Sequence, residues 1–394
     1  MGLFRLLLAA CVLFGHSQPL GGLNWLPAGT AVESFFVVSG FYMQLILSEK
    51  YTRQRLGDSW RLNFYVARYT RLFPTYAIGL ALTCIAGVLF LRISVSHHAV
   101  PPISIWAALS GLTPSLRNVA LWIGTVFANM TIFLQDLGGV LAVRDGQAVF
   151  TWDRNASEIY VWSALAITQA WSLGVELLFY LVAPFLLTGS DRRLLFWFAL
   201  GIVVKAAAFQ LLGGDLPYRM FPFVLMDFLG GALAYRYRFA LVRLLGRTTR
   251  IAAYAVMLTI VAGLPSSLTS AQVSWLAVVL TIFAVPALFD ATKTNGVDAQ
   301  FGELSYPFYI FHVLCLDMVG YVLQRLGVAN GVVLVSSALG ATLFVSFILV
   351  RLELRFLEPW RRRFGHEPAA IVLGFNAGEP SRAIVRSEAG AVDA

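Results

Sequence analysis

The chain has 394 residues and a formal net charge of +8; 58% of its residues are hydrophobic, only 13% are charged, and the mean hydropathy is +0.74. Because a soluble domain carries roughly a quarter charged residues, this composition excludes a soluble globular protein and indicates a polytopic membrane protein. Most lysines and arginines lie in short loops between apolar runs, so the excess positive charge indicates membrane topology rather than nucleic-acid binding.

Taken in chain order, the apolar runs predict an all-α protein with about ten transmembrane helices, since about 20 apolar residues cross a bilayer. The predicted spans are 4–22, 30–48, 72–91, 169–188, 193–212, 219–236, 250–266, 272–289, 305–323 and 331–350. Residues 103–137 are apolar enough to cross once or twice, and we interpret them as a re-entrant or interfacial segment.

The charges of the loops predict the orientation of these spans. Basic residues gather between Lys50 and Arg71, and again at 191–193, 236–250 and 351–366. The positive-inside rule places all of these segments, and both termini, in the cytoplasm. That arrangement requires an odd number of crossings between residues 72 and 168. One crossing gives ten spans, and a helical hairpin within 103–137 would give twelve.

Two segments are expected to lie outside the spans. Residues 138–168 form the longest polar loop, which faces outward in this topology. Residues 361–394 are rich in alanine, glycine and charge without periodicity, so we expect a disordered cytoplasmic tail after a transmembrane domain of residues 1–360.

Several ionisable residues fall within the predicted spans, where they are costly and usually face a cavity or a partner. They are His16, Glu33, Glu176, Lys205, Asp227, His312 and Asp317. His16 follows Arg5 by eleven residues, or about 16 Å of helix, which predicts a position near the midplane. Glu176 and His312 reach similar depths, so the sequence predicts a polar cavity shared with His16. The alternative is that each side chain makes a separate interhelical hydrogen bond.

His16 and Glu176 together suggest acid–base chemistry. A histidine in a wet cavity exchanges protons near neutral pH, and a neighbouring carboxylate would orient it. Without a nucleophile motif, such a pair would activate a substrate hydroxyl. A proton-coupled secondary transporter using the same pair as a relay remains the alternative. The adjacent His97 and His98 lack metal-ligand spacing, so no metal site is predicted.

A second motif, "FYVARYTRLFPTY" at 64–76, places Arg68 and Arg71 on one face of a helix. Paired guanidinium groups suit a phosphate-bearing ligand, and Arg5 at the same surface shares that reading. The alternative is contact with lipid headgroups. In "FFVVSGFYM" at 35–43, Ser39 and Gly40 are interpreted as small residues that permit close helix packing.

Together, five ordered features resemble the acyltransferase family 3 membrane O-acyltransferases, from Arg5 to about Trp360. They are Arg5 and His16 with ten residues between them, "ESFFVVSGF", "FYVARYTRLFPTY", "WSLGVELLFYLVAP" and "ELSYPFYIFH". The family includes enzymes that acylate O-antigen, peptidoglycan, Nod factors and macrolides. Where the family often has Gly-Val-Asp before the two phenylalanines, this chain has "AVES", with Glu33 near the aspartate position.

The resemblance implies transfer of an acyl group, often acetyl, from cytoplasmic acyl-CoA to a hydroxyl of a carbohydrate, glycolipid or similar acceptor at the outer face. It implies a multi-pass protein of the plasma membrane, the inner membrane in a Gram-negative bacterium. His16 would be catalytic with Arg5 and Glu176, and Arg68 and Arg71 would lie at the CoA end. Supporting positions near the substrates are Glu33, Ser39, Trp171, Ser172, Tyr306 and His312. Direct transfer and an acyl-histidine intermediate both remain open.

Overall fold

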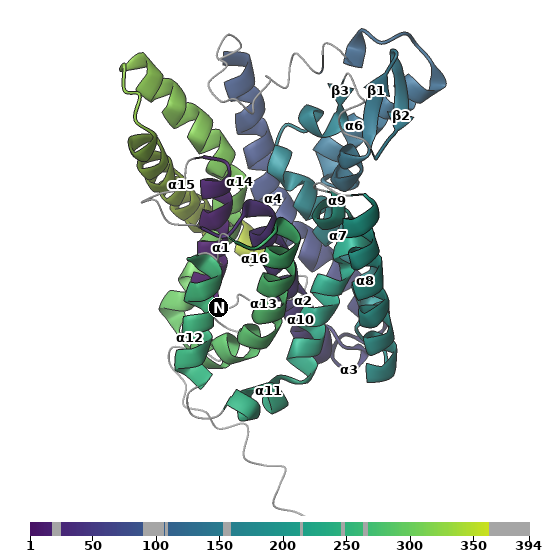
Figure 1. The fold of residues 1–394 in the computed structure, drawn as a ribbon, viewed down its shortest axis with the longest axis vertical. Coiled ribbons are helices and arrows are strands. Elements are labelled where there is room, and N and C mark those ends of the chain that lie inside the picture. Colours follow the sequence, from purple (N-terminus) through teal and green to yellow (C-terminus); the bar gives the residue numbers. More distant parts are fainter. Residues whose placement is uncertain are drawn as a thin grey trace, which may run out of the picture.

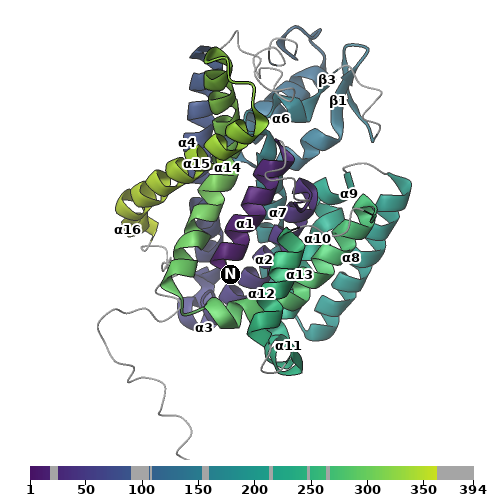
Figure 2. The same ribbon diagram turned by 60° about the vertical axis from the view of Figure 1, so that its left-hand side comes forward.

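The computed structural model describes residues 1–17, 25–89, 106, 109–152, 159–212, 216–245, 249–262 and 267–361. Helices dominate these ranges, and a small sheet lies at one end of the molecule (Figures 1 and 2). Within them, seven helical stretches are long and apolar enough to cross a membrane, which confirms a polytopic membrane protein. The predicted tail after residue 361 and the pair at 97–98 lie outside the described residues.

Each of the ten predicted spans contains a helix. The long ones are α2 (Ala28–Glu49), α4 (Trp60–Leu89), α7 (Trp171–Leu186), α8 (Asp191–Leu211), α13 (Ser270–Thr292), α14 (Gly296–Arg325) and α15 (Gly331–Leu352). The helical stretch that contains α7 begins one turn earlier, at Thr168, and so reaches 19 residues. Three others are shorter than a full crossing: α1 (Gly2–Gly15), α10 (Phe221–Arg236) and α12 (Thr249–Val261). Short helices at or near the ends of spans are α3 (Arg53–Leu56), α9 (Leu216–Arg219), α11 (Arg238–Leu245) and α16 (Glu358–Arg361).

Side-chain caps fix the starts of several helices. Ser190 accepts from the backbone at the start of α8, and Thr269 forms a reciprocal capping box with Gln272 at the start of α13. Asn295 and Asn330 accept backbone N–H groups at the starts of α14 and α15. These polar residues stand just before apolar runs, which is the sequence pattern of a helix start.

The packing of α2 against α10 depends on glycine. A side chain at Gly40 would overlap the carbonyl oxygen of Phe228, and one at Gly231 would overlap that of Val37. The two backbones therefore touch where side chains are missing, as small residues allow in membrane helices. The interpretation of "SG" at 39–40 as a packing element holds for Gly40.

Four helices meet at a buried cluster of charges. Lys205 Nζ on α8 lies 2.8 Å from Glu33 Oε1 on α2 and 2.8 Å from Asp227 Oδ2 on α10. Ser274 on α13 donates to the other Glu33 oxygen at 2.6 Å. Lys205 and Asp227 are 0% exposed and Glu33 is 1% exposed. These intramembrane charges thus contact one another, and Glu33, which was predicted to support the substrate site, lies in this cluster.

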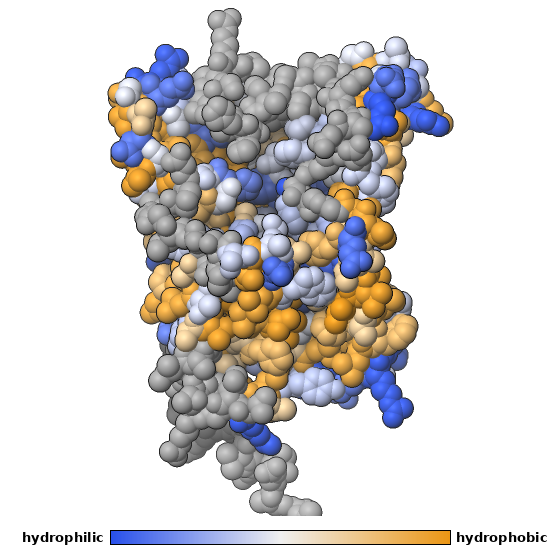
Figure 3. Space-filling model, viewed as in Figure 1, coloured by the Kyte–Doolittle hydropathy of each residue, from blue (hydrophilic) through white to orange (hydrophobic). Residues whose placement is uncertain are grey.

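The segment before the sheet contains α6 (Leu116–Thr131), which is too short to cross a bilayer. This helix buries Asn118, Thr125 and Asn129 while exposing large side chains such as Trp122 and Phe127. The apolar exterior suits contact with lipid, the reverse of a soluble helix. Figure 3 shows a wider apolar band across the middle of the molecule, with hydrophilic residues toward both ends.

The loop expected at 138–168 contains a three-stranded antiparallel sheet. Its strands are β1 (Leu141–Arg144), β2 (Gln147–Phe150) and β3 (Ile159–Tyr160), in the order β2-β1-β3. Asp145 and Gly146 connect β1 to β2 with φ values of 51° and 68°. Two consecutive left-handed residues form the tight turn that suits a hairpin.

Candidate active site

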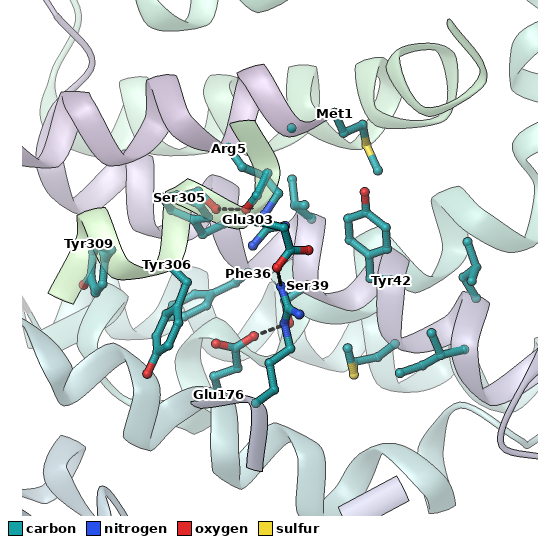
Figure 4. Close-up of a pocket in the computed structure, with 18 of the residues that line it drawn as sticks. Met1, Arg5, Phe36, Ser39, Tyr42, Glu176, Glu303, Ser305, Tyr306 and Tyr309 are labelled. Carbon is teal, nitrogen blue, oxygen red and sulfur yellow. Dashed lines mark hydrogen bonds and ion pairs between the residues drawn. The ribbon is translucent and has the colours of Figure 1, made fainter. Parts of the chain in front are cut away.

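A cavity of about 240 Å³ lies between α1, α2, α4, α7, α13 and α14. Its wall holds apolar side chains and three arginines, and it extends from Lys50 and Lys293 to Ser172 and Tyr309. Figure 4 shows Arg5, Tyr42, Glu176 and Glu303 converging on it from four different helices. Seven of the predicted site residues line this cavity: Arg5, Ser39, Arg68, Arg71, Ser172, Glu176 and Tyr306.

Arg5 is held in place by the packing of α1 on α14. Asp298 accepts from the backbone N–H of Gly2 at 2.7 Å and of Leu3 at 2.9 Å, so a carboxylate caps the positive end of α1. A side chain at Gly2 would overlap the Asp298 carbonyl, and the Arg5 guanidinium lies against Gly302. This contact directs Arg5 into the cavity. Asp298 was not among the predicted site residues.

Arg68 and Arg71 both line the cavity from α4, as their spacing predicts, but their surroundings differ. Arg71 Nη2 lies 3.1 Å from Glu303 Oε2 on α14. Arg68 Nε is buried and makes no hydrogen bond within the described residues. Arg71 is therefore paired with a carboxylate, whereas the Nε atom of Arg68 has no hydrogen-bond partner in this part of the structure. Tyr306, one turn after Glu303, donates to the Leu72 carbonyl at 2.5 Å and ties α14 to α4.

Glu176 on α7 is bound to residues of the cavity wall. Its Oε1 accepts from Ser39 Oγ at 2.7 Å and from the Tyr180 hydroxyl. The carboxylate thus faces the cavity with two hydroxyl donors beside it. The described lining of the cavity includes Glu176 but neither His16 nor His312.

His16 stands at the end of α1, with an exposed side chain, rather than in the middle of a helix that continues to residue 22. Its ring centroid lies 5.3 Å from that of His312, which is 0% exposed on α14. The structure therefore brings together two of the three predicted residues, His16 and His312, and places Glu176 with Ser39 and Tyr180.

Tyr309 joins the histidine pair to the cavity. Its hydroxyl lies 2.8 Å from Ser172 Oγ and donates to the Gln169 carbonyl at 3.0 Å. Its ring centroid lies 5.7 Å from that of His312, and it lines the cavity. Trp171, next to Ser172, packs against Arg219, whose guanidinium lies 5.1 Å from the indole ring. Ser172, a predicted site residue, thus contacts the tyrosine that joins the cavity to the histidine pair, and the predicted residue Trp171 directly precedes it.

Sequence reasoning missed Glu303 and Tyr309 as site residues. Both belong to "ELSYPFYIFH", where Glu303, Tyr306 and Tyr309 recur at roughly helical spacing. Polar residues at this spacing form one face of an otherwise apolar helix, and this pattern could have predicted both residues as part of the site.

A cavity with cationic walls, a carboxylate and a nearby histidine pair, set in a helical membrane domain, defines a membrane-embedded enzyme. The family model for the acyltransferase domain matches residues 1–351, so the chain belongs to acyltransferase family 3. It is an acyltransferase and a multi-pass membrane protein. No curated protein and no solved structure matches the chain significantly.

Proposed function

We propose that the enzyme transfers an acetyl group from acetyl-CoA, bound from the cytoplasm, to a hydroxyl of a carbohydrate or glycolipid acceptor reached from the outer face of the plasma membrane. The observation that carries this proposal is the cavity, which leads from basic residues at one end to Tyr309 beside the histidine pair at the other. The basic end coincides with the loops predicted to be cytoplasmic.

The donor would lie along this cavity. Arg5 and Arg68 are suited to the phosphates of CoA, because guanidinium forms paired, charge-assisted bonds to phosphate oxygens. Arg71 adds positive charge but is already paired with Glu303. Glu176 lies farther along, where its carboxylate is an acceptor suited to the amide N–H groups of the pantetheine arm.

Chemistry would take place beside His16. The imidazole takes the proton of the acceptor hydroxyl, and the oxygen attacks the thioester carbonyl. The new C–O bond forms as the C–S bond breaks, and His16 returns the proton to the leaving thiolate as free CoA. Because this requires a neutral imidazole, we expect activity to fall as the pH drops through the pKa of the histidine.

Thiol release tests the proposal. Proteoliposomes containing the full chain should consume acetyl-CoA and release free thiol when a carbohydrate acceptor is present. His16→Ala should abolish turnover while leaving the CoA affinity and unfolding temperature unchanged, and Ser17→Ala, at the neighbouring position, should remain active. Full activity of His16→Ala would refute the proposal. Trapping of labelled acetyl on the protein without acceptor would identify an acyl-histidine intermediate.

A further inference from the structure

His312 has a fixed arrangement of its two ring nitrogens. Nδ1 lies 2.7 Å from the backbone carbonyl oxygen of Tyr309, one turn earlier on α14. A carbonyl oxygen only accepts, so Nδ1 must carry the hydrogen, and in the neutral imidazole Nε2 is then an acceptor. Nε2 is buried and makes no hydrogen bond within the described part of the chain.

Such an acceptor is unusual. Nearly all buried polar atoms in native proteins find a partner, and an exception calls for an explanation such as a catalytic role. An acceptor without its bond in the interior costs free energy, since it has lost water and gained nothing. The other ring nitrogen, Nδ1, does have a partner, because it donates to the Tyr309 carbonyl, and this bond fixes the tautomer.

His16 is the neighbour able to supply the missing donor. Its ring centroid lies 5.3 Å from that of His312, with the two planes inclined by 39°. A hydrogen bond between the two rings requires a nitrogen–nitrogen distance of about 3 Å, and rings with centroids this close can reach it when His16 rotates about its side-chain torsion angles. The Tyr309 ring also contacts His312, but its hydroxyl is engaged with Gln169 and Ser172.

We propose that His312 is the positioning residue for His16. Its Nε2 accepts the N–H of one His16 nitrogen and thereby leaves the other nitrogen of His16 unprotonated toward the acceptor hydroxyl. The inference rests on the proposed function, in which His16 is the general base. It gives His312 the orienting role that a carboxylate has in hydrolase triads. Glu176 then has the separate role of binding the acyl donor in the cavity.

Two substitutions separate this role from simple packing. In His312→Gln the amide reaches the position of Nε2 and can still accept from His16. In His312→Asn the amide reaches only the position of Nδ1, so it keeps the bond to the Tyr309 carbonyl and loses the acceptor. We expect His312→Gln to retain kcat within about threefold. His312→Asn should lose at least about tenfold, but less than the 10²–10⁴-fold that a general base contributes. KM for acetyl-CoA and the unfolding temperature should match in the two variants.

Equal activity of His312→Asn and His312→Gln, whether both stay active or both lose activity, would overturn the positioning role of His312. If His16→Ala were inactive at the same time, the proposed function would still stand. Full activity of His16→Ala would instead refute the function on which the inference rests. If neither variant folds, nitrogen NMR of the wild-type enzyme with labelled histidine decides. An N–H···N coupling between two histidines, absent in His16→Ala, is expected, and its absence from the wild type would overturn the proposal.

Discussion

Arg71 and Glu303 form a salt bridge across the wall of the cavity, with Nη2 and Oε2 3.1 Å apart, while Arg68, one turn earlier on α4, has a buried Nε without a hydrogen bond in the described residues. Two arginines that look equivalent in the sequence thus have different tasks. Arg71 joins α4 to α14, and Arg68 is the one that we propose binds the acyl donor.

This difference predicts opposite phenotypes for the two arginines. Arg68→Gln should raise KM for acetyl-CoA by about tenfold or more, since a charged hydrogen bond contributes about 1.5–3 kcal/mol. Arg71→Gln should change KM less and lower the unfolding temperature, because it removes the salt bridge to Glu303 that joins α4 to α14. Steady-state kinetics and thermal unfolding measure both effects. Arg61→Gln, an exposed position on the same helix, is the control; an equal rise in KM for Arg68→Gln and Arg71→Gln would contradict this division.

The buried charge cluster should be far more sensitive than its surface counterparts. Lys205→Met removes the cation between Glu33 and Asp227, and such a change typically costs about 3–5 kcal/mol because it leaves buried charge uncompensated. Chemical unfolding in detergent should reveal the loss of stability. Lys293→Met, on an exposed lysine, should leave the free energy of unfolding nearly unchanged. Similar stability of both variants would mean that the buried charge cluster contributes nothing to the free energy of unfolding.

Asp136 predicts a stability change with pH. It lies outside the helical stretches that are long enough to cross a membrane, is 3% exposed, and burial raises its pKa from 3.8 to about 6 against the opposing effect of backbone N–H groups. A raised carboxyl pKa in the fold favours the neutral form, so stability present at pH 4 is lost as the pH rises to about 6. Asp136→Asn should therefore stabilise the protein at pH 7.5, by up to about 3 kcal/mol, and change little at pH 4. Melting curves at the two pH values test this; equal stabilisation at both would exclude titration of Asp136 as the cause.

Gly40 and Gly124 form a matched pair for helix packing. A methyl group at Gly40 would overlap the backbone of α10, whereas one at Gly124 on α6 meets no described atom. Gly40→Ala should destabilise the protein by about 1–3 kcal/mol or more through overpacking. Gly124→Ala should be neutral or stabilising by up to about 1 kcal/mol, the gain in helix propensity. Unfolding measurements in which Gly40→Ala is harmless would rule out the close contact.

Much of the fold could be predicted, because apolar length alone locates helices in a bilayer. The residues at which the helices begin and end were harder to predict. The first span was predicted to reach residue 22, although Pro19, Gly21 and Gly22 are residues that end helices, and α1 stops at Gly15. The Asp145–Gly146 pair was a hairpin signal inside a presumed loop.

The site was predictable as a set of residues but not as a set of pairs. Spacing along one helix gives the shared face of Arg68 and Arg71, whereas the partner of Glu176 depends on which helices lie side by side. Hydropathy does not encode that order, because lipid and helix interior are about equally apolar. Depth alone therefore could not distinguish a His16–Glu176 pair from the observed neighbours His16 and His312.

The link between Glu33 and Lys205 also bears on how the protein is made. Glu33 leaves the ribosome some 170 residues before the lysine that compensates it. During that interval α2 carries an acid without its counter-ion, so either protonation or a shielding factor must accompany its insertion. The helix can settle in its final place only after α8 has been translated.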